Sequence, residues 1–206
     1  MKNGPSNTSR ILAFTGPSGV GKTTISRLLV RSRDNREHMP ILTTRGPRRG
    51  DDGEYHYLGA EAFLCLQRAG NLAACTRIPS QSEERFYGYR HRDFEAVWNK
   101  GKLPIAITDL RLLEGLAEMF GRQSIVSVGL LPPGETEDAM LDELHRRLCM
   151  RGRDSEASMQ ERLQNAKDDI RLCRERPALF DAVFINDDLD ETIDKLERLI
   201  INAPSP

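Results

Sequence analysis

A short glycine-rich segment, residues 16–23, constrains the fold of this chain more than any other part of its sequence. It follows the pattern G-x-x-x-x-G-K-[ST], with an apolar run at 10–15 before it and an amphipathic stretch at 22–33 after it. Glycines at these positions let backbone N–H groups face an anion at the start of a helix. The pattern and its context therefore predict a strand, a phosphate-binding loop and a helix, in that order.

The side chains at the end of the loop indicate which anion it binds. In this pattern the lysine reaches the outer phosphates of a nucleotide and the next hydroxyl ligates Mg²⁺, so we expect these roles for Lys22 and Thr23. A glycine turn that happens to precede a lysine is the alternative, and the flanking strand and helix argue against it. The residues expected to bind ATP are Gly16, Pro17, Ser18, Gly19, Val20, Gly21, Lys22, Thr23 and Thr24.

Apolar runs alternate with helical stretches through the rest of the chain. Further strands are expected at 103–108, 124–131 and 184–185, and helices at 93–100, 112–120, 141–148, 155–176 and 193–200. Such alternation is typical of a parallel sheet covered by helices. The fold class predicted from the sequence is therefore α/β with a central parallel sheet.

The stretch from 41 to 91 breaks this alternation. It consists of short aromatic and polar pieces separated by glycine-rich turns, with one helical stretch at 61–68. We interpret 41–91 as an inserted lobe and 10–40 together with 92–202 as the core. The ends, 1–9 and 203–206, are polar and lack an apolar period, which predicts flexible termini.

Composition narrows the range of partners. The chain has 30 lysines and arginines against 31 aspartates and glutamates, a net charge of -1, so no overall field attracts nucleic acid or a membrane surface. No stretch approaches the roughly 18 apolar residues of a membrane helix. The four cysteines show no metal or redox spacing, which suggests a reducing compartment. We expect a cytoplasmic monomer or homodimer that binds neither nucleic acid nor membrane.

A basic turn at 43–50 predicts a second phosphate site. It contains Arg45 and Arg48 and is followed by Tyr55 and Tyr57. Guanidinium groups suit a phosphate dianion because each can offer two parallel charge-assisted hydrogen bonds. A solvated basic turn is the alternative.

Two further groups of polar residues have both a catalytic and a structural interpretation. Arg147, Arg151 and Arg162 could stabilise the charge of a moving phosphoryl group, or form a solvated helix face. Asp109 ends the strand at 103–108, where parallel sheets present functional groups. It could orient Mg²⁺ or its waters, cap the next helix, or do both.

Five segments taken together resemble the guanylate kinase family in order and spacing. They are residues 16–23, 43–48, 86–88, 151–155 and 186–190. The resemblance covers nearly the whole chain. It implies a P-loop kinase fold with a parallel-sheet core, an acceptor-binding lobe at about 41–91 and a mobile helical lid at about 151–161.

The resemblance also implies a reaction and its residues. The γ-phosphoryl group of ATP would pass to a nucleoside monophosphate, GMP or dGMP, with Mg²⁺ as cofactor. Since the acceptor phosphate is mostly dianionic at neutral pH, no protein base is required. Catalytic roles fall to Lys22, Arg45, Arg151 and Arg162, further ATP contacts to Arg147 and Asn186, and magnesium binding to Thr23 and Asp109. The implied acceptor-binding residues are Arg45, Arg48, Tyr55, Tyr87, Tyr89 and Asp109.

The chain departs from the family pattern at three positions that read guanine. The family has a serine, a glutamate and a serine or threonine where this chain has Ile41, Ala74 and Tyr89. Either Glu83 or Glu84, in the stretch 79–84, could substitute for the missing glutamate. The sequence thus leaves the base of the acceptor open.

Two alternative functions follow from other departures. Only Asp109 remains of two acids that the family usually has there, and nearby Arg111 is reminiscent of the ribose 1,5-bisphosphate phosphokinases. That branch usually lacks the second clamp arginine, present here as Arg48, so it ranks second. The lost guanine readers are also compatible with a non-catalytic interaction module, such as the membrane-associated guanylate kinase homologues, although the complete phosphate loop argues against it.

Overall fold

The computed structural model describes residues 10–47, 51, 53–78, 85–152 and 155–203. Its larger sheet has five strands, and every pair of neighbours is parallel. In sheet order these are β2 (Arg36–His38), β7 (Leu103–Thr108), β1 (Ile11–Thr15), β8 (Ile125–Leu131) and β9 (Ala182–Ile185). The predicted α/β architecture with a central parallel sheet is confirmed.

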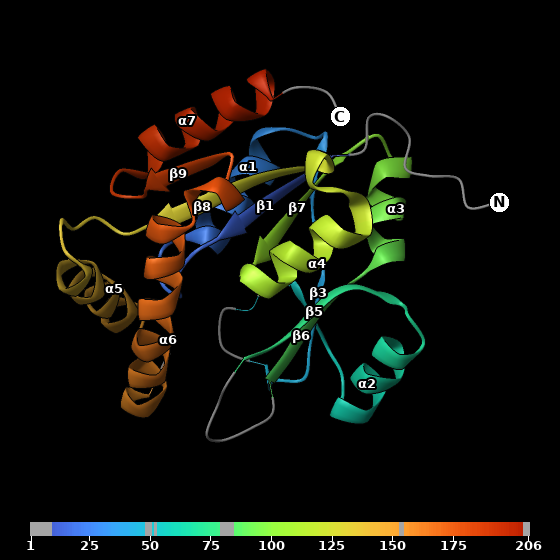
Figure 1. Cartoon of the computed structure of the whole chain (residues 1–206), viewed down its shortest axis with the longest axis horizontal. Coiled ribbons are helices and arrows are strands. Elements are labelled where there is room, and N and C mark those ends of the chain that lie inside the picture. Colours follow the sequence, from blue (N-terminus) through green and yellow to red (C-terminus); the bar gives the residue numbers. More distant parts are fainter. Residues whose placement is uncertain (1–9, 48–50, 52, 79–84, 153–154, 204–206) are drawn as a thin grey trace.

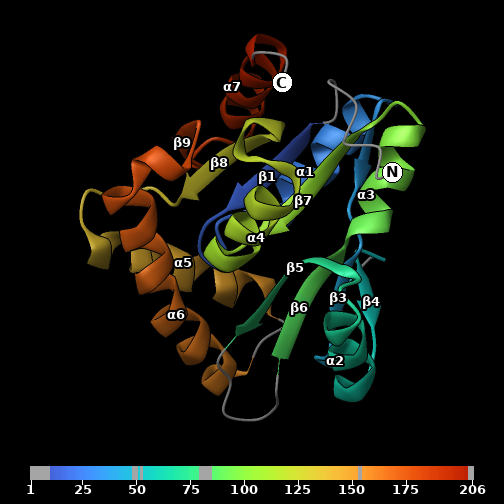
Figure 2. The ribbon, with the colours of Figure 1, turned by 45° about the vertical axis from the view of Figure 1, so that its right-hand side comes forward.

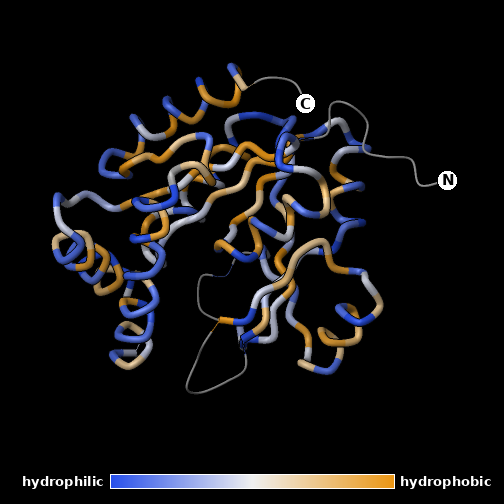
Figure 3. Tube along the Cα trace, in the orientation of Figure 1, coloured by the Kyte–Doolittle hydropathy of each residue, from blue (hydrophilic) through white to orange (hydrophobic). Residues whose placement is uncertain are grey.

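The middle of this sheet forms the hydrophobic core. All five residues of β1 and all seven of β8 are buried, as expected for parallel strands covered on both faces. In Figure 3 the central strands are coloured mainly as apolar, whereas apolar and polar residues alternate along the surrounding helices. The helices of this part are α1 (Lys22–Ser32), α3 (His91–Asn99), α4 (Leu110–Phe120), α5 (Glu137–Arg151), α6 (Glu156–Glu175) and α7 (Leu189–Asn202), with short 3₁₀ turns at Arg122–Ser124 and Pro177–Leu179.

A second, smaller sheet lies below the core in Figure 1. Its order is β4 (Tyr55–Tyr57), β3 (Ile41–Thr43), β6 (Arg85–Arg90) and β5 (Leu72–Ile78), with α2 (Ala60–Arg68) beside it. Strands β3 and β4 are parallel, while β6 is antiparallel to both β3 and β5. The region that broke the strand and helix alternation in the sequence thus forms a mixed sheet of its own.

The side chain of Tyr89 links the two sheets directly. Strand β2 pairs with β7 only as far as Ile105. The backbone of Ile107 therefore lies beyond the end of β2 on that side of β7. The hydroxyl of Tyr89, in β6, donates to the Ile107 oxygen (2.7 Å) and accepts from the Ile107 nitrogen (2.9 Å). The Tyr89 side chain is fully buried. It therefore satisfies two polar groups that would otherwise be left at an uncovered strand edge.

In the turned view of Figure 2, helices α5 and α6 lie to the left of the small sheet. Gly152, whose φ of 60° is left-handed, follows the last residue of α5, and Ser155 caps α6. None of the helices within the described ranges combines the length and apolar character needed to span a membrane.

Candidate functional site

The loop between β1 and α1 needs two of its glycines for steric reasons. Gly16 has a φ of 148°, and a Cβ there would lie 2.2 Å from the carbonyl oxygen of Leu130. Gly21 has a φ of 111°, and a Cβ there would lie 2.4 Å from Nδ2 of Asn186. Any larger residue would push the loop away from β8 and Asn186, so these glycines allow the loop to lie tightly against the end of the sheet.

Lys22 begins α1 and turns back over this loop. Its ammonium donates to the carbonyl oxygens of Gly16 and, at 3.0 Å, of Pro17. Burial lowers the pKa of Lys22, and the carboxylate of Asp169 opposes that effect more than any other charge. The loop thus holds a cation at the point where backbone N–H groups and the helix N-terminus already favour an anion.

Asn186 and Arg147 support the loop from behind and do not line the cavity described below. Asn186 donates from Nδ2 to the carbonyl of Val20 at 2.7 Å. Arg147 donates to the carbonyl of Asn186 at 2.9 Å and to that of Val20 at 3.4 Å. Their contacts are therefore with the backbone that shapes the loop.

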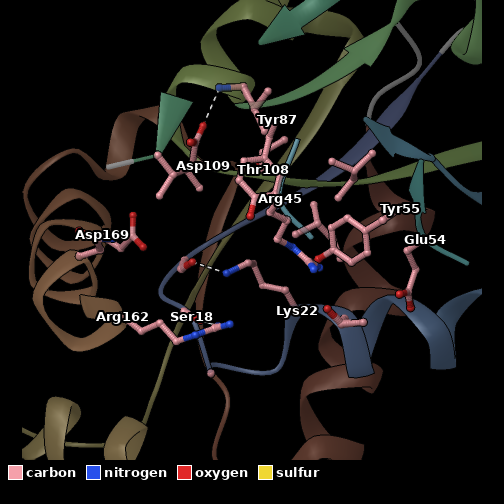
Figure 4. A pocket seen from close by; sticks show the side chains of 18 of the residues that line it. Ser18, Lys22, Arg45, Glu54, Tyr55, Tyr87, Thr108, Asp109, Arg162 and Asp169 are labelled. Carbon is pink, nitrogen blue, oxygen red and sulfur yellow. Dashed lines mark hydrogen bonds between the residues drawn. The ribbon is translucent and has the colours of Figure 1, made fainter. Parts of the chain in front are cut away.

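A cavity of about 350 Å³ extends from the loop to the small sheet. Figure 4 shows Lys22 between two groups of side chains, Asp169 and Arg162 from α6 on one side and Arg45, Tyr55 and Glu54 on the other. The cavity is also lined by Ser18, Thr23, Thr24, Tyr87, Asp109 and Arg151. Most of the residues that the sequence selected therefore come together in one place.

Arg45 lines the cavity on the side away from Asp169 and Arg162. It is 4% exposed, and its two terminal nitrogens donate to the carboxylate of Asp51 at 2.8 and 3.0 Å. Its guanidinium lies 4.2 Å from the ring centre of Tyr55. Burial acts to lower the pKa of Arg45, but its hydrogen bonds to Asp51, together with electrostatic interactions with Tyr55 and Tyr87, raise the pKa overall. The arginine is thus a fixed cation with its hydrogen-bonding fork already oriented by a carboxylate.

Two predicted acceptor residues have a different status. Tyr89 does not line the cavity, because its hydroxyl is used at Ile107 and its side chain is sealed between the two sheets. It forms a structural link and is not part of the cavity wall. Arg48 lies outside the described residues, as do Glu83 and Glu84.

Helices α5 and α6 contribute the arginines nearest the loop. Arg162 donates from Nη1 to the hydroxyl of Ser18 at 2.6 Å, which connects α6 directly to the loop. Arg151 is the exposed last residue of α5 and lines the cavity. One residue earlier in α6, Glu161 forms an ion pair with Arg85 of β6 at 3.0 Å. The helix that carries Arg162 therefore contacts both the loop and the small sheet.

Asp169 is a cavity residue that the sequence interpretation missed. It lies on α6 and faces the cavity in Figure 4. Burial raises its pKa to about 6, the Lys22 cation works against this rise, and Asp109 adds to it. It lies seven residues, about two helical turns, after Arg162 and so on the same face of α6, a signal that the sequence interpretation did not use.

Asp109 confirms the capping interpretation. Its Oδ1 accepts a hydrogen bond from the backbone nitrogen of Leu112 at 2.8 Å, which caps α4, and the residue also lines the cavity. Among the described residues there is no group of three or more acidic, histidine or cysteine side chains that could hold a metal ion by itself.

Comparison with known proteins gives one consistent answer. The family model described as guanylate kinase matches residues 8–203. A guanylate kinase of Rhodospirillum rubrum is 33% identical over 192 residues, covering 92% of this chain and 81% of that protein. One of Nitratidesulfovibrio vulgaris is 33% identical over 193 residues, covering 93% and 86%.

A solved structure agrees with this match. The crystal structure of guanylate kinase from Anaplasma phagocytophilum superposes with a TM-score of 0.68 at 25% identity, covering 94% of this chain and 85% of that one. The predicted P-loop kinase fold is thereby confirmed. A match over nearly the whole chain, with the phosphate loop and the arginine cluster in one cavity, leads to one conclusion: this chain belongs to the guanylate kinase family.

Proposed function

We propose that this protein transfers the γ-phosphoryl group of ATP to the phosphate of GMP. The observation that carries the proposal is a single cavity with the loop and Lys22 at one end, Arg45 and Tyr55 at the other, and Arg162 beside the loop. Phosphoryl transfer between two bound phosphates needs positioning and positive charge more than covalent chemistry. This cavity offers both.

The donor end would bind the triphosphate. The backbone N–H groups of the loop and the start of α1 favour its β- and γ-phosphates. The ammonium of Lys22, which contacts two loop carbonyls, would move to the phosphate oxygens, which are stronger acceptors. Arg147 and Asn186 would act on ATP indirectly, by holding the backbone of Val20 in place.

The acceptor end would bind the monophosphate. Arg45 can exchange the carboxylate of Asp51 for a phosphate, which offers its two nitrogens the same bidentate geometry. Tyr55 and Tyr87 line the cavity beside it. Because the second pKa of such a phosphate is near ~6, the dianion attacks without a protein base.

The arginines of α5 and α6 would complete the site. Arg162, already at the loop, and Arg151 would compensate the negative charge that spreads over the moving group. We propose that residues 151–161 act as a lid and 41–91 as the acceptor-binding lobe. Closure of the two would exclude water, which is a competing acceptor.

The residues present fit a magnesium ion. Thr23 and Asp109 both line the cavity and offer a hydroxyl and a carboxylate oxygen, and Mg²⁺ takes such ligands together with waters and substrate phosphates. The lack of an all-protein metal cage among the described side chains agrees with that mode of binding. When bound, the ion would neutralise charge on the phosphates of ATP.

The proposal is tested by measuring ADP release from ATP and Mg²⁺ with GMP as acceptor. We expect turnover that depends on both substrates. Replacing Arg45 with Ala should chiefly raise the KM for GMP, whereas replacing Arg162 with Ala should chiefly lower kcat. Absence of ADP release in folded protein that binds ATP would refute the proposed activity.

A further inference from the structure

Two neighbouring residues of β8 hold the phosphate loop and one turn of α6. A Cβ on Gly16 of the loop would lie 2.2 Å from the carbonyl oxygen of Leu130. A Cβ on Gly129, the residue before it, would lie 3.4 Å from the sulfur of Cys173 in α6. Cys173 is 2% exposed and lies about one helical turn after Asp169. The strand therefore fixes the loop and this part of α6 relative to each other.

Asp169 points from this turn of the helix toward the cavity. The next residue, Ile170, is fully buried in the core, which holds the backbone in place. Arg162, Asn165 and Asp169 recur at helical spacing and all line the cavity, so one face of α6 is turned toward it. At the other end of this face Arg162 donates to Ser18 of the loop at 2.6 Å. The carboxylate of Asp169 is thus carried by a helix that is anchored on both sides of it.

Lys22, in contrast, is a flexible cation. Its ammonium donates to the carbonyls of Gly16 and Pro17, and its four-carbon stem allows it many other positions. Burial lowers the pKa of Lys22; among the charges of the described residues, Asp169 opposes that fall most and Arg151 adds to it. Figure 4 shows Asp169 on the α6 side of Lys22. A fixed anion therefore lies beside the one cation of the loop that has to change partners.

We propose that Asp169 is a positioning residue for Lys22: its carboxylate, fixed on α6, keeps the ammonium in place against the outer phosphates of ATP during transfer. The inference rests on the proposed function and adds a residue to it. An ammonium has three donors, so it can bond phosphate oxygens while a carboxylate attracts it from another side. The effect belongs to the rate, because a misplacement of about 1 Å can slow a reaction by up to about a hundredfold.

The test removes the charge and then restores it. Burial raises the pKa of Asp169 to about 6, so the group is ionised at pH 8. At that pH, Asp169→Asn should lower kcat for ADP release with ATP and GMP about tenfold, with each KM changed by less than about threefold. Asp169→Glu should recover most of the lost kcat, and Asp168→Asn, at an exposed neighbouring position, should leave kcat unchanged. Equal kcat in Asp169→Asn and Asp168→Asn would overturn the inference, as would a loss that Asp169→Glu does not restore.

A double-mutant cycle tests whether Asp169 acts through Lys22. If it does, adding Asp169→Asn to Lys22→Met should lower kcat no further. A full tenfold loss in both backgrounds would mean that the two residues act independently, and the inference would be wrong. The Mg²⁺ concentration required for half-maximal turnover should be the same in Asp169→Asn and the native protein. An increase of about tenfold or more would place the carboxylate at the metal ion and would also overturn the inference.

A measurement without turnover separates this inference from the proposed function. Nuclear magnetic resonance relaxation of the Lys22 ε-carbon is recorded with a non-hydrolysable ATP analogue bound. The ε-carbon should be rigid in the native protein and in Asp168→Asn and mobile in Asp169→Asn. If this difference is found but the native protein releases no ADP with GMP, the proposed activity is wrong and the inference stands. Equal rigidity in all three proteins overturns the inference, whatever the activity of the native protein.

Discussion

At the residue scale, the ammonium of Lys22 can exchange its hydrogen-bond acceptors at a low cost in free energy. Its ammonium contacts carbonyl oxygens of its own loop, and neutral acceptors hold a cation less strongly than phosphate does. Replacing Lys22 with Met should therefore lower kcat by about a hundredfold or more while the melting temperature is retained. The control is Lys195→Met, an exposed lysine that pairs with Glu191 on α7; if both variants keep normal turnover, the role assigned to Lys22 is wrong.

Asp169 gives a pH-dependent prediction. Its ordinary pKa of 3.8 is raised to about 6 by burial, so the folded state holds this proton more tightly than the unfolded chain. The free energy of unfolding contributed by this group must then fall as the pH rises from about 4 to about 6. Asp169→Asn should consequently gain stability relative to the native protein between pH 4 and pH 7, as measured by urea unfolding.

A direct measurement checks the cause of this shift. The Asp169 carboxyl carbon, followed by nuclear magnetic resonance, should titrate with a midpoint near 6. Lys22→Met should move the midpoint upward, because the lysine cation favours the ionised carboxylate. A midpoint near 4, or one that does not respond to loss of Lys22, would contradict the described environment.

At the element scale, the ion pair of Arg85 and Glu161 joins the small sheet to α6. Its side chains are 11% and 21% exposed, and its atoms are 3.0 Å apart. Solvent screens it less than a surface pair, so a double-mutant cycle with alanine should give a coupling of about 1 kcal/mol in unfolding free energy. The exposed pair Lys195 and Glu191 on a single helix should give less, about 0.3–0.5 kcal/mol.

Enzyme kinetics would provide a second measurement of the effect of this ion pair. If the small sheet and α6 move relative to each other during turnover, breaking the pair should change the KM for the acceptor as well as the stability. A coupling indistinguishable from zero would mean that the contact does not hold the two elements together.

The limits of the sequence interpretation also lie at this scale. Strands β1, β7 and β8 were predictable because they are long apolar runs. Strand β2 was missed because it has three residues, Arg36 to His38, with no apolar period. Arg36 is buried there by a bidentate ion pair with Glu197 of α7, at 2.6 and 2.7 Å. A partner 161 positions away leaves no local signal.

The same distinction between local sequence signals and long-range contacts holds for the residues of the cavity. Lys22 and Arg45 could be selected because each lies in a local pattern with its own phosphate chemistry. Asp169 shares a helix face with Arg162, but it was not selected, and its buried environment depends on how α6 packs over the loop. Tyr89 was assigned to the acceptor from its position after Tyr87, but the register of β6 and the open edge of β7 place it between the sheets.

At the scale of the whole molecule, the hydroxyl group of Tyr89 forms one of the contacts that link the core to the small sheet. Tyr89 satisfies both backbone groups of Ile107 at a point that β2 does not cover. In Tyr89→Phe these two groups lose their hydroxyl partner, and a buried unsatisfied group costs about 1–3 kcal/mol. We therefore expect the free energy of unfolding to fall by roughly that amount.

The region that is destabilised in Tyr89→Phe distinguishes a contact between the two sheets from the loss of a hydrogen bond within one element. Amide hydrogen exchange in Tyr89→Phe should speed up in β6 and at the end of β7 together, because the hydroxyl is shared by both elements. The matched control is Tyr57→Phe, which removes a hydroxyl that donates to Asp51 from a residue that is 39% exposed. That variant should lose less stability, since water can replace the bond. If Tyr89→Phe is no less stable than Tyr57→Phe, the two sheets are held together by apolar packing alone, and the hydroxyl merely fills the gap at the edge of β7.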